Sequence, residues 1–188
     1  MADDSRAAPR VRLRGADKFK GKWLSGWSPT PMPVVTEALR LAEVRSRDLV
    51  FDLGCGDGRV LVRAAKMVGA RAIGFDIDPS RIRVTKTRIA NAGVSDLVRV
   101  RHQDLLSVPD FQRASVVFLY LPPGAVNKLK PLLRTRCKAG TRILTVSYKL
   151  RGCVTGAHFR SWRAQKELVM RMRQQKWYIR MWLVKGRS

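Results

Sequence analysis

The chain has 188 residues, of which 45% are hydrophobic, so it is long enough for one domain with a full core and too short for two ordinary ones. It carries 38 Lys and Arg residues against 14 Asp and Glu, which gives a formal net charge of +24. No run approaches the roughly 18 apolar residues that span a bilayer, and the three cysteines and two histidines lack the spacing of a disulfide framework or a metal site.

Residues 1–27 are predicted to form a basic arm ahead of a domain over residues 28–188. The arm lacks hydrophobic periodicity, and its strongest apolar anchors are Trp23 and Trp27. Its Arg, Lys, Ser and Ala content is similar to that of an organelle transit peptide, although three aspartates interrupt the pattern. This composition favours a mitochondrial location, with the cytoplasm as the alternative.

The central part of the chain alternates between apolar strands and amphipathic helices. A stiff turn with three prolines over residues 28–33 precedes a predicted helix over residues 34–42. The predicted strands cover residues 48–53, 71–77, 97–102, 114–121 and 141–148, and the predicted helices between them cover residues 59–68, 80–92 and 124–136. This rhythm predicts an α/β fold with a mostly parallel sheet.

The last 40 residues break that rhythm. Two alternating runs, residues 168–173 and 177–185, are predicted to form a β-hairpin that adds two strands to the sheet. Tyr178 and Trp182 share a parity, as residues on the core face of a strand would. We therefore expect most of the aromatic residues Trp177, Tyr178 and Trp182 to pack in the core, with Arg173 and Arg180 pointing outward.

A glycine-rich turn follows the first strand of the sheet. Gly54, Gly56 and Gly58 occupy alternate positions in Asp52-Leu-Gly-Cys-Gly-Asp-Gly58. Glycines there let the backbone turn sharply and approach a ligand closely. A pyrophosphate would be repelled by Asp52, whereas an ammonium group would bind it, which favours S-adenosylmethionine over a dinucleotide.

Two further acids follow the next two strands. Asp76 lies 24 residues after Asp52, at a position where an acid can bind both ribose hydroxyls. Asp104 follows the third strand and could accept a hydrogen bond from an adenine amino group. Because open α/β sheets bind ligands at the carboxyl ends of their strands, these acids are predicted to share one site.

The sequence resembles the small protein-lysine methyltransferases of class I, which include an archaeal broad-specificity enzyme and mitochondrial enzymes that act on the ATP synthase c-subunit or the adenine nucleotide translocase. The resemblance rests on Thr30-Pro31 with Val34-Val35, on residues 52–59, and on Lys138-Ala-Gly-Thr-Arg142. It implies a Rossmann-like fold with seven strands, S-adenosylmethionine as the donor, and N-methylation of lysine. The residues predicted to bind the cofactor are Thr30, Asp52, Leu53, Gly54, Cys55, Gly56, Gly58, Asp76, Ile77, Gln103 and Asp104.

Tyr120 and Tyr148, which end the fourth and fifth predicted strands, are the candidate catalytic residues. The alternative is that each is an amphipathic residue at the edge of the core. The stretch Tyr120-Leu-Pro-Pro123 invites comparison with the Asp/Asn-Pro-Pro-aromatic motif of enzymes that methylate base amino groups. Because Leu121 cannot hold an amino group and Gly124 supplies no ring, that motif is rejected.

The basic charge is concentrated in the second half of the chain. Residues 111–188 contain 18 Lys and Arg residues and a single acid, Glu167. Such a surface attracts polyanions, above all nucleic acid. The resemblance implies a protein-lysine substrate as the partner, whereas the charge predicts a ribonucleoprotein, with RNA contacts through the arm and the C-terminal half. The second hypothesis is an RNA- or ribosome-bound assembly factor that keeps the methyltransferase fold, active on RNA or catalytically silent.

Overall fold

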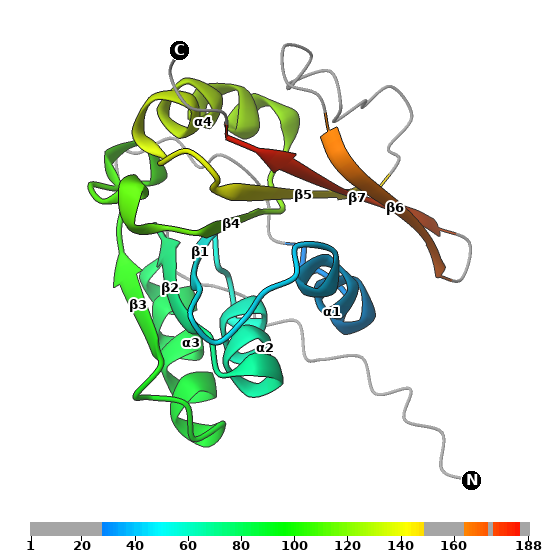
Figure 1. Cartoon of the computed structure of the whole chain (residues 1–188). Helices are drawn as coiled ribbons and strands as arrows, with labels where there is room; N and C mark the ends of the chain where they lie inside the picture. The colour runs from blue at the N-terminus through cyan, green and yellow to red at the C-terminus, as the bar shows by residue number, and fades with distance from the viewer. Residues whose placement is uncertain (1–27, 149–163, 173–174, 185–188) are drawn as a thin grey trace, which may run out of the picture.

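The structure is a computed structural model that describes residues 28–148, 164–172 and 175–184 (Figure 1). The predicted arm over residues 1–27 lies outside these residues, and so do Arg173 and the side chain of Tyr148. The strands are β1 Leu49–Leu53, β2 Arg71–Asp76, β3 Val98–His102, β4 Val116–Leu119, β5 Arg142–Tyr148, β6 Ala164–Met172 and β7 Gln175–Leu183. The helices are α1 Met32–Leu41, α2 Arg59–Val68, α3 Pro79–Asn91 and α4 Pro123–Arg136, with two short 3-10 helices, η1 Leu105–Ser107 and η2 Phe111–Arg113.

One sheet contains all seven strands in the order β3-β2-β1-β4-β5-β7-β6. Strands β1 to β5 are parallel, and β7 runs antiparallel to both of its neighbours. The predicted α/β fold, with a mostly parallel sheet and a C-terminal hairpin, is therefore confirmed. None of the helices in the described part of the chain is long and apolar enough to cross a bilayer.

Two hydrophobic layers cover the two faces of the sheet (Figure 1). Helices α1, α2 and α3 pack on one face, and α4 packs on the other with η1 and η2. The central strand β4 is buried along its whole length, as a strand covered on both faces should be. Because β1, β2 and β4 are parallel, their carboxyl ends lie along one edge of the sheet, where a ligand site can form.

Several predicted boundaries differ from the observed ones. Helix α1 begins at Met32 rather than at residue 34, because Pro33 lies in its first turn, where the missing N–H costs nothing. Strand β4 is shorter than the predicted residues 114–121. At its start, Ser115 turns its hydroxyl to the backbone N–H of Leu49, and at its end the Pro122-Pro123 pair stops the ladder.

The hairpin was predicted at the right place, and core packing of most of its aromatic residues is confirmed, because Trp177 and Trp182 are buried. Strand β6 starts four residues earlier than predicted, at Ala164, because a charged edge strand carries little alternation. On β7 the residues that pack against the α1 side are Trp177, Ile179 and Met181, not Tyr178 and Trp182. Trp182 is buried on the opposite face and donates to Thr145 Oγ1 at 3.0 Å, so the strand buries aromatic rings on both sides. Tyr178 is half-buried, and Arg180 on its face, also half-buried, pairs with Glu167.

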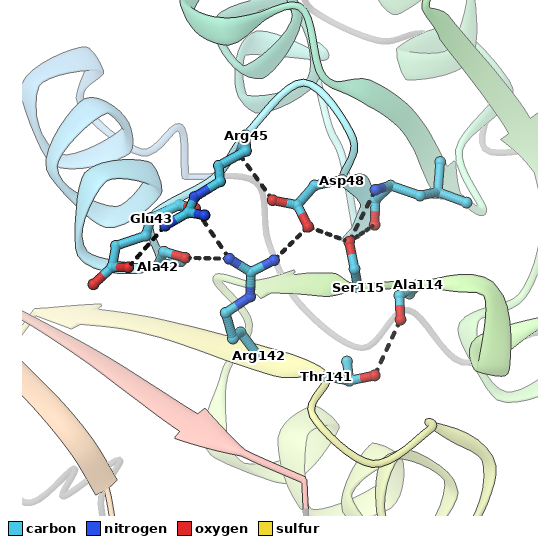
Figure 2. A network of polar contacts seen from close by, with 9 residues as sticks. Ala42, Glu43, Arg45, Asp48, Ala114, Ser115, Thr141 and Arg142 are labelled. Atoms are coloured by element: carbon cyan, nitrogen blue, oxygen red, sulfur yellow. Dashed lines mark hydrogen bonds and ion pairs between the residues drawn. The ribbon is translucent and has the colours of Figure 1, made fainter.

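A polar network closes the opposite edge of the sheet, where β1, β4 and β5 begin (Figure 2). The guanidinium of Arg142 pairs with Asp48 and donates to the carbonyl of Ala42 at 2.6 Å. Ser115 Oγ donates to Asp48 at 2.7 Å, and Thr141 Oγ1 donates to the carbonyl of Ala114 at 3.0 Å. Thr141 and Arg142 of the Gly-Thr-Arg stretch therefore act in the framework, far along the strands from the carboxyl edge.

Candidate functional site

The glycine turn after β1 has the backbone that only glycine adopts easily. Gly54, Gly56 and Gly58 have φ values of 82°, 55° and 77°, in the left-handed region that disfavours other residues. A Cβ at Gly54 would lie 2.9 Å from Leu121 Cδ2, and one at Gly58 would lie 2.6 Å from Thr85 Cγ2. The sharp turn predicted for the three glycines is therefore confirmed, and Gly54 and Gly58 also pack closely against neighbouring side chains. Close approach of this backbone to a ligand stays a prediction.

Strand β2 holds this turn in place. The backbone N–H groups of Gly54 and Cys55 donate to the carbonyl of Phe75 at 2.8 and 3.0 Å. The next N–H, that of Gly56, donates to Asp76 Oδ2 at 2.9 Å. From α3, Thr85 Oγ1 donates to the carbonyl of Gly56 at 2.8 Å. The structure therefore brings the residues of the glycine turn and Asp76 together into one rigid unit.

Asp52 is a buried acid at the end of β1. Only 3% of its surface is exposed, and its carboxylate makes no hydrogen bond or ion pair with the described residues. Burial, together with the nearby charges of Asp76 and Asp57, raises the pKa of Asp52 well above its ordinary value. A carboxylate in this setting is stabilised most by a cationic ligand group.

Asp76 and Asp104 lie beside each other along the same edge but differ in burial. Asp76 is buried, and besides Gly56 it accepts a hydrogen bond from the backbone N–H of Asp78 at 3.0 Å. Asp104 is exposed and accepts from the N–H of Leu106 at 2.9 Å, so part of its role is to cap η1. Because each carboxylate oxygen has two lone pairs, both acids keep acceptor capacity for a ligand.

The neighbours of these two acids are placed by backbone contacts. The N–H of Gln103 donates to the carbonyl of Asp76 at 2.9 Å. His102 Nε2 lies 2.8 Å from the carbonyl of Ile77. The amide of Gln103 reaches Ser107 Oγ at 2.9 Å, so its side chain supports the loop that carries Asp104. Ile77 and Gln103 therefore lie next to Asp76, as predicted.

Arg59 ties the predicted Thr30 to the glycine turn, a link that the sequence interpretation missed. Its Nη1 donates to the carbonyl of Thr30 at 2.8 Å, and its Nη2 pairs with Asp57 at 2.7 Å. Arg88 of α3 reaches the same carboxylate at 2.9 Å. Although burial alone would raise the pKa of Asp57, hydrogen bonds and charge from the two arginines lower it below its ordinary value. Asp57 therefore stays ionised, whereas Asp52 has no such partner among the described residues.

Leu53 and Cys55 belong to the turn but turn their side chains into the protein. Leu53 is fully buried in the core on the α4 side, so only its backbone can face a ligand. The Cys55 side chain packs over Gly74, where an added Cβ would come within 2.8 Å of Cys55 Sγ. Burial, helped by the charges of Asp52 and Asp76, raises the pKa of the Cys55 thiol well above its ordinary value. This thiol is a packing group and a poor nucleophile.

Tyr120 lies at the same carboxyl edge, directly after β4. Its ring packs against Trp177 of β7, with ring centroids 5.8 Å apart, and its hydroxyl is 3.5 Å from Ser28 Oγ. It is half-buried, which fits either a core-edge residue or one that faces an acceptor. Tyr148 ends β5 in register with Trp177, but its side chain lies outside the described part of the structure.

The arrangement is a carboxyl-edge site for an organic ligand with one cationic end and several hydroxyl or amino groups. The buried acid receives the cation, and the neighbouring acids receive the neutral donors. Within the described ranges no group of three or more His, Cys, Asp or Glu residues is placed to hold a metal ion, and the absence of a metal remains a prediction.

Sequence comparison places the chain among methyltransferases. The family model described as the ANTKMT methyltransferase domain matches residues 52–156. A protein-lysine N-methyltransferase of Saccharolobus islandicus is 37% identical over 125 residues, which cover 66% of this chain and 77% of that protein. A ribosomal protein L11 methyltransferase of Enterobacter is 36% identical over 84 residues, which cover 45% of this chain and only 28% of that protein.

Comparison with solved structures also finds methyltransferases. The crystal structure of an RNA methyltransferase from Salinibacter ruber, in complex with S-adenosyl-L-homocysteine, is 34% identical. It superposes with a TM-score of 0.71 and covers 86% of this chain and 96% of that one. TrmN from Thermus thermophilus, with a TM-score of 0.69 and 16% identity over 81% of this chain and 48% of that one, shares the fold.

Proposed function

The chain belongs to the ANTKMT methyltransferase family, and we propose that it transfers a methyl group from S-adenosylmethionine to the side-chain nitrogen of a protein lysine. It is a methyltransferase that uses S-adenosylmethionine, as the family model and the relatives indicate. Lysine as the acceptor is supported by the Saccharolobus islandicus relative. The single structural observation that supports the cofactor part of the proposal is the buried Asp52 carboxylate, which lacks a cationic partner among the described residues.

The residues along the carboxyl edge fit this cofactor. We propose that Asp52 binds the ammonium group of its amino-acid end, whose positive charge offsets the burial of the carboxylate. Asp76, fixed by the N–H of Gly56, would bind the ribose hydroxyls, and Asp104 would accept from the adenine amino group. Thr30, Gln103 and Ile77 would complete the walls, and the glycines leave the backbone open to the ligand.

Bound S-adenosylmethionine supplies a methyl group on a positively charged sulfur. The protein has to present a neutral amine to that carbon, in line with the breaking C–S bond. An acceptor lysine must therefore lose a proton before transfer, either by desolvation or to a nearby base. Tyr120, held between Ser28 and Trp177, is positioned to orient that amine through its hydroxyl, and Tyr148 is the second candidate for this role.

RNA contact is the second candidate function, and one surface of the described chain favours it. Residues 123–138, which comprise helix α4 and the two residues after it, contain five basic residues and no acid. Lys128, Arg134, Arg136 and Lys138 are exposed, and none has an acidic partner among the described residues. The similarity to the Salinibacter ruber protein, which is described as an RNA methyltransferase, supports the same alternative. Ribosome association, a mitochondrial location and RNA binding by the arm remain predictions.

A transfer assay with labelled donor separates the two candidates. The full chain is incubated with methyl-labelled S-adenosylmethionine and either RNA-free protein or protein-free RNA, and the product is hydrolysed and identified. The lysine proposal expects label in methyllysine, and the same reaction with the Asp52→Asn variant as control should give no label. Label confined to a methylated nucleoside would replace the lysine proposal with the RNA alternative.

A further inference from the structure

Helices α2 and α3 pack side by side on one face of the sheet (Figure 1). Side chains of both helices line a groove on the surface between them. Three cations line it, Lys66 from α2 and Arg83 and Arg88 from α3. Its apolar lining comes from Val62, Val84 and Ala92. None of these six residues belongs to the cofactor site proposed above.

The two helices around the groove are strongly basic. Helices α2 and α3 together carry seven Lys and Arg residues and no Asp or Glu. Four of the seven are engaged with described side chains, namely Arg59 and Arg88 with Asp57, Arg63 with Thr36, and Arg81 with Asp78. Lys66, Arg83 and Lys86 are exposed and have no acidic partner within the described ranges. Two of the three cations that line the groove, Lys66 and Arg83, are therefore not neutralised by a described acid.

The apolar part of the groove points to a protein rather than to a nucleic acid. Val84 is 52% exposed between the cations, and Val62 and Ala92 are partly buried around it. A nucleic acid would contact this surface mainly through its phosphates, which engage the cations but leave the exposed Val84 uncovered. Apolar side chains flanked by cations instead match an amphipathic helix whose polar face is acidic.

We infer that the α2–α3 groove binds an acidic amphipathic helix of a protein partner. The apolar side chains of that helix would cover Val62, Val84 and Ala92, and its carboxylates would lie against Lys66 and Arg83. A partner of this kind would also offset the repulsion between the +24 chain and a lysine-bearing target. The inference concerns binding alone and does not depend on which acceptor is methylated.

The test is a titration of the full chain with three labelled probes, followed by fluorescence anisotropy. The first is a peptide of about 18 leucine and glutamate residues with its leucines on one helical face. The second has the same composition in scrambled order, and the third is poly(U) RNA. The amphipathic peptide should bind at least about tenfold more tightly than the scrambled one, a difference of about 1.4 kcal/mol.

Two double variants with the same change of net charge locate the binding. Lys66→Glu with Arg83→Glu should weaken peptide binding about tenfold or more, whereas Lys128→Glu with Arg134→Glu on α4 should change it less than about twofold. Val84→Ser, which alters no charge, should also weaken the peptide. Equal binding of the scrambled peptide, equal losses in both double variants, or loss of poly(U) binding alone in the groove variant would overturn the inference. All three variants lie on the surface, and thermal unfolding verifies that they fold.

Discussion

The carboxylate of Asp76, at the end of β2, accepts a hydrogen bond from the backbone N–H of Gly56 at 2.9 Å. An acid at the end of β2 thereby holds the glycine turn that follows the neighbouring strand β1. The residue proposed to bind the ribose is therefore the same residue that fixes the backbone of the turn. Any change at Asp76 therefore acts both on the proposed ligand contact and on the turn, and a test of the site has to separate the two.

Asp76→Ala should weaken binding of S-adenosylhomocysteine by more than tenfold, because two ribose hydroxyls lose their acceptor. Thr85→Val is the matched control, since it removes the hydrogen bonds of Thr85 with the Gly56 carbonyl and the Cys55 thiol, both in the glycine turn, and keeps the side-chain volume. Its affinity should fall by less than about threefold. Calorimetry with both variants shows whether Asp76 binds the ligand or only supports the turn. Similar losses of affinity in the two variants would mean that Asp76 only supports the turn.

Asp52→Asn should raise the free energy of unfolding of the ligand-free protein near neutral pH. The pKa of Asp52 is raised in the folded state by burial and by the charges of Asp76 and Asp57, so the folded protein holds this proton more tightly than the unfolded chain. Stability therefore falls as pH rises above the ordinary value of 3.8. Urea unfolding at several pH values should show the variant gaining most near neutral pH and little near pH 4. A variant less stable than the wild type at neutral pH would contradict the assignment.

The Asp48–Arg142 network predicts the opposite pH dependence. Burial alone would raise the pKa of Asp48, but hydrogen bonds from Ser115 and Arg45 and the charge of Arg142 lower it below 3.8. Its stabilisation is therefore present above that value and is lost as pH falls through the lowered pKa. Arg142→Met should destabilise the protein by about 3 kcal/mol, since it leaves a buried carboxylate without its charge partner. Cofactor affinity, measured at a temperature where the variant is folded, should not change.

Leu121→Ala should retain methyl transfer. Leu121 packs against Gly54, with Cδ2 2.9 Å from the position of an added Cβ, so its loss loosens one wall of the turn but removes no polar group. We expect kcat/KM to fall by less than about tenfold, the effect of a partly filled cavity at a half-buried site. Complete loss of activity would mean that the rejected Asp/Asn-Pro-Pro-aromatic comparison has to be reconsidered.

Tyr120→Phe tests whether the hydroxyl near Ser28 orients the acceptor. The ring contact with Trp177 should survive, so we expect kcat to fall about tenfold or more while the affinity for S-adenosylmethionine stays the same. Tyr148→Phe serves as the parallel variant at the end of β5. If both variants turn over at the wild-type rate, the two tyrosines are core-edge residues and deprotonation depends on desolvation.

The carboxyl edge of the site could be predicted from the sequence because its signals are local. Gly54, Gly56 and Gly58 directly follow a short apolar strand, and an acid at the end of a parallel strand has only one edge of the sheet to occupy. Helix α2 has the predicted bounds, since glycine precedes and follows it. Asp104 was predicted at the right edge, but its use as the cap of η1 could not be foreseen without the loop geometry.

The features that could not be predicted from the sequence are mainly contacts between residues that lie far apart along the chain. Arg142 and Asp48 are 94 positions apart, and nothing in either neighbourhood indicates the other. The shared parity of Tyr178 and Trp182 does not identify a single core face of β7, because the strand buries Trp177 on one side and Trp182 on the other. Strand β6, at the edge of the sheet, begins in a polar stretch, Gln165-Lys166-Glu167, that hides its start.

Calorimetric titration of the full chain with S-adenosylmethionine, in two buffers of different ionisation enthalpy, tests the central claim most directly. The account predicts binding in the micromolar range, on the order of −8 kcal/mol. At pH values between the ordinary and the raised pKa of Asp52, the heat should depend on the buffer, because the ligand's ammonium lowers that pKa and releases a proton. The Asp52→Asn variant should lose both the affinity and the buffer dependence. Full-affinity binding by that variant, or no binding by the folded wild type, would contradict the assignment of Asp52 as the cation-binding residue of a working cofactor site.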